Sequence, residues 1–248
     1  MLIEQSAYTN LWRRVSPAAK GLFSLCGLVA AFTAATPATA CGIAAILCAV
    51  TVLGAGIPPV RYLRVAAPAL LFLTVSALSL AVSLKIGGSI GDVSLHLAQT
   101  EFAKVAQVCG RSLGGLAALL FLTLTTPLID IIALLRRLKA PEVLLDIMVL
   151  CYRTLFVFSE SVHDTITAQS ARLGYTTARI SMRSLGGLVA NITVQVWQRS
   201  QALHMAAMAR NNDGPLRFIE HTYPNSARDV CIALGGGIVL VALSMVII

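Results

Sequence analysis

The chain has 248 residues, of which 57% are hydrophobic and 12% are charged, and its mean hydropathy is +0.80. Soluble domains carry about 25% charged residues, so this composition excludes an ordinary soluble protein and indicates an all-α, polytopic membrane protein. The formal charge of +8 at pH 7 does not indicate nucleic-acid binding, because the basic residues form no patch with interleaved aromatic side chains.

Two apolar runs follow the polar N-terminal residues 1–20. They lie at about 21–35 and 38–56, and Thr36-Pro37 between them is typical of a turn. Basic residues before the first run and the sequence Ala38-Thr39-Ala40 would also fit a cleaved signal peptide, an alternative that stays open. A hairpin of two membrane-spanning helices accounts for both runs.

Three further apolar runs approach the roughly 20 residues that a bilayer-spanning helix requires, at about 65–84, 112–129 and 230–248. Pro68 falls in the expected first turn of the third span, where proline is tolerated, and Pro127 is expected to bend or end the fourth. A Gly-rich, mildly polar connection at 85–104 separates these two spans. The sequence therefore predicts about five transmembrane helices.

Glycines inside the predicted spans are candidates for close helix contacts. Gly110 and Gly114 form a small-xxx-small pair, which lets two helix backbones approach each other. Glycine is also simply frequent in membrane helices, so the pair has two interpretations. Gly235-Gly236-Gly237 would similarly permit tight packing of the last span.

The distribution of charge predicts the topology. With the N-terminus in the cytoplasm, 16 of the 19 Lys and Arg residues fall on the cytoplasmic side, which satisfies the positive-inside rule. The other three fall at or beyond the outer boundary: Lys85, Lys104 and Arg111. The predicted organisation is a membrane domain (1–129), a cytosolic helical domain (130–228) and a C-terminal transmembrane helix (229–248) with its end outside.

The cytosolic segment is predicted to contain two long helices. Pro141 is placed like the first residue of a helix, and Glu142 to Gln169 contains no Gly or Pro, so a helix of about 42 Å is expected. Its part 143–158 is nearly apolar all round but contains two charges, so it is either a sixth span or an amphipathic helix against the membrane or partner helices. Gly186-Gly187 is expected to interrupt the chain before a second helix from Leu188 to Arg210.

Each long helix ends in a similar short sequence. The first end is Ala171-Arg172-Leu173-Gly174 and the second is Ala209-Arg210-Asn211. Small neighbours allow another protein surface to approach, and an arginine offers five donors in a fixed fork suited to carboxylates and helix ends. The two ends therefore predict two docking points for partner proteins.

The sequence contains no constellation that indicates catalysis. A Gly-x-x-x-x-Gly-Lys-Ser/Thr phosphate loop is absent, which argues against ATP binding of that kind. The four histidines are far apart and predict no metal site, and His163-Asp164 is typical of a solvated helix face. We therefore expect that the chain is not an enzyme and that it binds no cofactor.

The chain resembles the transmembrane T component of energy-coupling factor (ECF) transporters, of the CbiQ type found in cobalt importers. The resemblance covers nearly the full length. The residues that carry it are Ala7-Tyr8-Thr9-Asn10-Leu11-Trp12-Arg13 with Pro17 to Lys20, Leu134-Leu135-Arg136-Arg137-Leu138-Lys139-Ala140-Pro141, Tyr152-Arg153 with Glu160, and both Ala-Arg ends. The family signature is a pair of Ala-Arg-Gly motifs. Here Leu173 looks inserted before Gly174, and Asn211 stands where Gly is usual.

The resemblance implies a coupling subunit of a multi-pass importer in the bacterial inner membrane, linked to cobalamin biosynthesis. Its expected partners are two cytosolic ATPase subunits (CbiO-like), a substrate-binding membrane subunit (CbiM-like) and a small auxiliary membrane subunit (CbiN-like). ATP would be bound by the ATPases, whose motion would pass through the two Ala-Arg ends. Pro141 would start the first coupling helix.

Other functions remain as alternatives. Nickel is as compatible with the residues as cobalt, because the sequence shows no ligand cluster. A secondary carrier would be expected to show intramembrane charges or inverted repeats, and neither is evident. An ordinary ABC permease typically docks its ATPase through one coupling loop per chain, so two matched ends favour the ECF-type component.

Overall fold

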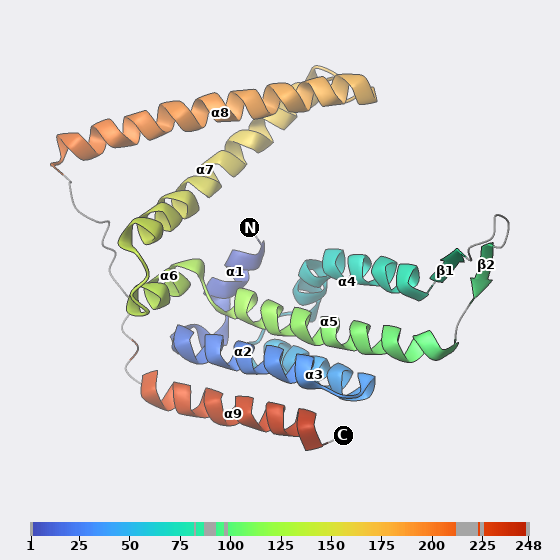
Figure 1. Ribbon diagram of the computed structural model, residues 1–248. Helices are drawn as coiled ribbons and strands as arrows, with labels where there is room; N and C mark the ends of the chain where they lie inside the picture. Colours follow the sequence, from blue (N-terminus) through green and yellow to red (C-terminus); the bar gives the residue numbers. More distant parts are fainter. Residues whose placement is uncertain are drawn as a thin grey trace. The chain divides into compact units, whose positions relative to one another are not determined.

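The computed structural model describes residues 2–81, 83–86, 93–96, 99–211, 223 and 226–246. The chain forms two compact units, each treated separately below. The membrane unit comprises Met1–Leu134 with His221–Ile248, and the helical unit comprises Leu135–Glu220. Figure 1 shows the elements of both.

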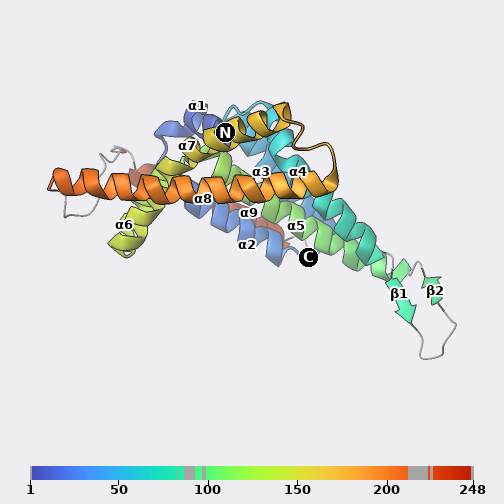
Figure 2. The same ribbon diagram turned by 90° about the horizontal axis from the view of Figure 1, so that it is seen from above.

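The described part of the membrane unit is almost entirely helical, which confirms the predicted all-α class. Its elements are α1 (Leu2–Thr9), a 3-10 turn (Leu11–Arg14), α2 (Pro17–Thr33), α3 (Pro37–Ala49) continued by a π-helical turn (Val50–Gly54), α4 (Pro59–Ala81), β1 (Ser83–Ile86), β2 (Val93–His96), α5 (Gln99–Thr125) and α9 (Ser226–Val246). Helix α6 (Leu128–Arg137) begins in this unit, and its last three residues belong to the helical unit. Strands β1 and β2 pair antiparallel, with Ser83 opposite His96; β2 lies inside the predicted connection, and β1 begins in the last two residues of the predicted third span. They extend from the ends of α4 and α5 (Figure 2).

Four described helices are long and apolar enough to cross a bilayer: Pro37–Gly54, Pro59–Leu80, Val105–Thr125 and Ser226–Met245. They correspond to four of the five predicted spans. The first predicted span lies in α2, whose 17 residues make a shorter apolar helix of about 26 Å. The segment 143–158 lies in α7 of the helical unit, which is not among the four, so the structure gives no support to a sixth span there.

Helix α2 packs against α3, α5 and α9, and the contacts depend on small residues. A Cβ on Gly114 would lie 2.5 Å from Cβ of Ala31, and one on Gly110 would lie 3.1 Å from Cβ of Ala40. Both glycines of the small-xxx-small pair are thus true packing positions, which decides between the two interpretations. In the last span, a Cβ on Gly237 would lie 2.6 Å from Cβ of Cys26.

Helix boundaries in the membrane unit follow local chemistry. Thr36 is the N-cap of α3, where its Oγ1 accepts a hydrogen bond from Thr39 N at 3.3 Å, and Pro37 follows in the first turn. This confirms the predicted turn. Pro68 was predicted in a first helical turn, but α4 begins at Pro59 and Pro68 lies in its interior. Hydropathy located the apolar stretch, whereas the helix starts earlier, in a segment containing arginines.

The helical unit contains α7 (Glu142–Ala171) and α8 (Ala178–Ala209), which meet at one end and diverge from it (Figure 1). The predicted interruption at Gly186-Gly187 is wrong, because α8 passes through both glycines without a break. Glycine costs only about 1 kcal/mol in a helix interior. A Cβ on Gly187 would lie 4.0 Å from Nε2 of Gln169, so the small residue sits where α7 and α8 are close.

Candidate functional site

The two Ala-Arg ends have nearly the same backbone conformation. Arg172 caps α7 with φ −96° and ψ 18°, and Arg210 caps α8 with φ −96° and ψ 6°. The next residue is left-handed in both cases, with φ 58° at Leu173 and 51° at Asn211. Its N–H bonds the carbonyl three residues earlier, at 3.0 Å in each. The two ends are therefore structural equivalents as well as sequence repeats.

This equivalence corrects the interpretation of Leu173. Leu173 and Asn211 occupy the same left-handed position, so Leu173 is the counterpart of Asn211 and is not an insertion before Gly174. Gly174 N donates to Gln169 O at 2.9 Å, and Leu173 N donates to Ser170 O, which together form a Schellman motif. Asn tolerates the left-handed region, whereas leucine occupies it at a cost of roughly 1–2 kcal/mol.

The first end is held in place by a polar network with the start of α8. Gln169 Nε2 donates to Ser184 O at 3.1 Å, and Ser184 Oγ donates to Gly174 O at 2.8 Å. Tyr175 OH donates to Gln169 Oε1 at 2.6 Å. Farther along the two helices, Ser161 Oγ donates to Gln195 Oε1 at 2.6 Å. These bonds fix the Arg172 backbone to both helices.

The two ends are far apart along α8. Its 32 residues correspond to about 48 Å; the α7 end is hydrogen-bonded to Ser184, near the beginning of α8, whereas Arg210 lies at its termination. Both arginines are exposed, and neither forms an ion pair within the described residues. The structure thus presents two separated, exposed cations, one at the end of α7 and one at the end of α8.

Both long helices expose apolar side chains. Leu145 is the only buried residue of α7, and α8 has none. Exposed apolar side chains of α8 include Val189, Trp197, Met205 and Met208, at 63%, 66%, 71% and 58% exposure. Exposed apolar surface on this scale marks contact with a membrane or another protein.

The chain enters α7 through a turn of the same kind as the first Ala-Arg end. Lys139 is left-handed with φ 59°, Lys139 N donates to Arg136 O at 3.0 Å, and Ala140 N donates to Leu135 O at 3.1 Å. Pro141 was predicted to be the first helical residue, but it is the N-cap of α7, whose first helical residue is Glu142. Its ψ of 129° is extended, and its carbonyl accepts the first N–H bonds of the helix. Pro141 still starts the helix, as expected.

The N-terminal stretch that carried the family resemblance caps the end of α5. Helix α5 stops at Thr125, before Pro127, so its last carbonyls lack helical partners. Asn10 Nδ2 donates to Thr125 O at 3.0 Å and to Leu124 O at 3.4 Å. Lys20 Nζ donates to Thr125 O at 3.0 Å, although only 2% of Lys20 is exposed. A cation at a helix C-terminus also interacts favourably with the helix dipole.

Trp12 from the same stretch fills the adjoining space. Its ring packs edge-on against Phe121 at 6.0 Å between centroids, and its Cζ2 would lie 2.8 Å from a Cβ on Gly54. Leu11 N donates to Ala55 O at 3.1 Å. Sequence patterns missed this cap because it joins residues more than 100 positions apart. The one available signal was a lysine immediately before an apolar run.

Within the described residues, no group of three His, Cys, Asp or Glu side chains lies close enough to hold a metal ion. His163 and Asp164 are both exposed, as expected of a solvated helix face.

Comparison with known proteins identifies the relatives of the chain. A family model described as cobalt transport protein, CbiQ, matches residues 9–220. The cobalt transport protein CbiQ of Rhodobacter capsulatus is 32% identical over 217 residues, covering 88% of this chain and 86% of that protein. A putative fused cobalt transport protein, CbiMQ, of Methanocorpusculum labreanum is 28% identical over 92% of this chain.

An uncharacterised protein of Methanocaldococcus jannaschii is 37% identical over 111 residues, or 45% of this chain. The match covers 41% of the length of the Methanocaldococcus protein and 40% of the length of the fused CbiMQ protein, so the chain spans about two fifths of each.

Proposed function

Because this chain belongs to the CbiQ family of cobalt transport proteins, we propose that it is the coupling subunit of an ATP-driven, ECF-type cobalt importer. In this proposal it is a scaffold that transmits motion from ATPase subunits to a substrate-binding membrane subunit. The observation that carries it is the pair of equivalent arginine-capped helix ends, which are exposed and are separated by most of the length of α8.

The geometry of the ends supports docking to two ATPase subunits. Each arginine follows an alanine and precedes a sharp left-handed turn, so a partner groove can approach the helix end closely. A guanidinium entering such a groove makes charge-assisted bonds to carboxylates or helix C-termini. If the two ATPases approach each other on binding ATP, each would then carry the arginine-capped end that is docked in it, one from α7 and one from α8.

The network at the first end supports transmission of this motion. Gln169, Ser184 and Tyr175 tie the turn after α7 to α8, so a force on Arg172 reaches both helices instead of a loose loop. The exposed apolar faces of α7 and α8 would contact the substrate-binding membrane subunit or the bilayer.

The fused CbiMQ relative supports a membrane partner, since its name joins two transport proteins in one chain. We propose a separate CbiM-like subunit here, with a small CbiN-like auxiliary subunit on the strength of the family resemblance. The substrate would be bound by the CbiM-like subunit and ATP by the CbiO-like ATPases. This chain would be non-catalytic and would lie in the cell membrane with its N-terminus and residues 130–228 in the cytoplasm.

Reconstitution tests this function. The chain should co-purify with two ATPase subunits and a substrate-binding subunit, and cobalt uptake should require all of them together with ATP. ATP hydrolysis that stays with this chain after removal of the ATPases would contradict the proposal. Uptake of nickel in place of cobalt would retain the coupling role and change only the cargo.

A further inference from the structure

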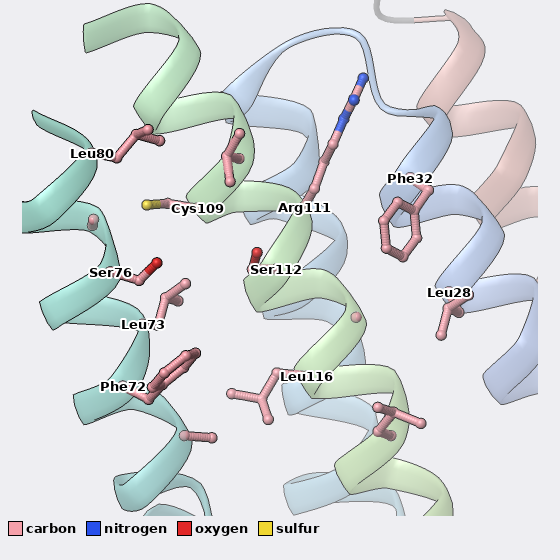
Figure 3. A pocket seen from close by; sticks show the side chains of 15 residues that line it. Leu28, Phe32, Phe72, Leu73, Ser76, Leu80, Cys109, Arg111, Ser112 and Leu116 are labelled. Atoms are coloured by element: carbon pink, nitrogen blue, oxygen red, sulfur yellow. The ribbon is translucent and has the colours of Figure 1, made fainter. Parts of the chain in front are cut away.

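A groove runs between three helices of the membrane unit (Figure 3). Helix α5 forms its floor, and α4 and α2 form its two walls. The groove has a volume of about 440 Å³, and its lining is apolar except for Ser76, Cys109, Arg111 and Ser112. Gly115 leaves the floor hollow, since a Cβ there would meet only Phe32 Cε2, at 3.8 Å.

The length of the groove matches one leaflet. On α5 it runs from Val108 to Leu119, and on α4 from Ala69 to Leu80. Eleven residue steps of helix make about 17 Å in each case. Half of a hydrocarbon core of about 30 Å is about 15 Å. A lipid acyl chain lying along the helices would therefore fit the groove end to end.

A cation stands near one end of the groove. Arg111 is half-buried, and its Nη2 donates to Ala34 O, the C-cap of α2, at 3.1 Å. Figure 3 shows its side chain directed away from the apolar floor, towards the turn between α2 and α3. Two apolar helices reverse direction at this turn, so their unpaired backbone groups belong at the membrane interface. Arg111 thus extends to the level of the lipid phosphates.

The guanidinium retains hydrogen-bonding capacity at that level. One Nη2 donor is used by Ala34 O, and the Nε is shielded from solvent, so a phosphate would be bound through the remaining Nη donors. Arginine has five N–H donors, and phosphate oxygens accept them in a bidentate geometry. The arrangement of a cation at the interface end and an apolar channel below it is complementary to an anionic phospholipid.

We propose that this groove binds an anionic phospholipid, with one acyl chain between α4 and α5 and the phosphate on Arg111. The bound chain would fill the gap beside α4, which exposes much of its apolar surface, for example Phe72 at 74%. The proposal does not depend on the coupling function, because every residue that it uses lies in the membrane unit.

Photo-crosslinking tests the proposal on the full chain in nanodiscs. The probes are phosphatidylglycerol and phosphatidylcholine with the same diazirine-bearing acyl chain. Phosphatidylglycerol should crosslink preferentially, at residues 69–80 and 108–119. Arg111→Gln should lower its crosslinking about ten- to a hundred-fold, as expected from losing charge-assisted bonds, and Arg111→Lys should retain part of it. Arg64→Gln, at an exposed position on α4, is the matched control and should change nothing.

A second variant separates the contribution of the acyl-chain groove from that of the Arg111 charge. Gly115→Leu should fill the floor and reduce crosslinking of both lipids at these residues. Gly42→Leu should have no effect, because nothing lies within 4 Å of a Cβ at Gly42. Equal crosslinking of the two lipids to the wild type, or an unchanged preference in Arg111→Gln, would overturn the proposal. Crosslinks that map to other helices, or a partner subunit that occupies the groove in the assembled transporter, would do so as well.

Discussion

Replacement of Lys20 by methionine should destabilise the membrane unit without disturbing its packing. Methionine keeps the apolar stem of the side chain and removes the ammonium that donates to Thr125 O at 3.0 Å. A hydrogen bond from a charged group contributes about 1.5–3 kcal/mol. The carbonyl is not left bare, because Asn10 still bonds it at 3.0 Å, so the loss should not exceed this range.

Thermal unfolding in detergent measures the effect. At about 2–4 °C per kcal/mol for a chain of this size, Lys20→Met should lower Tm by about 3–12 °C. Arg14→Met, at an exposed position in the same N-terminal stretch, should leave Tm unchanged. The double variant Lys20→Met/Asn10→Ala should lose more than the sum of the single variants, since both caps of Thr125 are then gone. A wild-type Tm for Lys20→Met, or an equal loss for Arg14→Met, would refute the capping argument.

Further predictions concern the left-handed turn, the helix packing and the topology. Leu173→Gly should stabilise the helical unit by about 1 kcal/mol in thermal unfolding, because glycine adopts the left-handed conformation without the strain of leucine. Asn211→Gly should change the stability little, and equal effects of the two substitutions would contradict the assigned strain. Gly114→Leu should destabilise the membrane unit by about 1–3 kcal/mol or more, because even its Cβ would overlap α2, and Gly42→Ala at an open site should be tolerated. Reporter fusions after Lys139 and after the C-terminal residue should report cytoplasmic and external positions; the same side for both would require one span fewer or one more.

The sequence predicted those elements that local chemistry determines. Apolar runs located the four long apolar helices, and Thr36-Pro37 located the turn before α3. The Ala-Arg repeats located two helix ends whose backbones the structure shows to be equivalent. In each case a few neighbouring residues carry the information, so no knowledge of the tertiary structure was required.

The failures arose where tertiary contacts outweigh local preference. Gly186-Gly187 looked like a helix break, but the packing of Gln169 and Ser184 at the junction of α7 and α8 supports a continuous helix there. The cap on α5 was missed because Asn10 and Thr125 meet only in the fold. Pro68 was misplaced because hydropathy marks where the membrane begins and says little about where a helix begins.

The central claim, that Arg172 and Arg210 dock two ATPase subunits, is tested most directly by co-purification of those subunits with arginine variants. Each Arg→Ala change should weaken ATPase binding roughly ten- to a hundred-fold, from about 1.5–3 kcal/mol per charge-assisted bond. Arg→Lys should rescue poorly, because it retains the charge and loses the fork. The double Arg→Ala variant should reach the membrane folded, yet fail to retain either ATPase and fail to support cobalt uptake. Wild-type ATPase retention and uptake by the double variant would contradict the account.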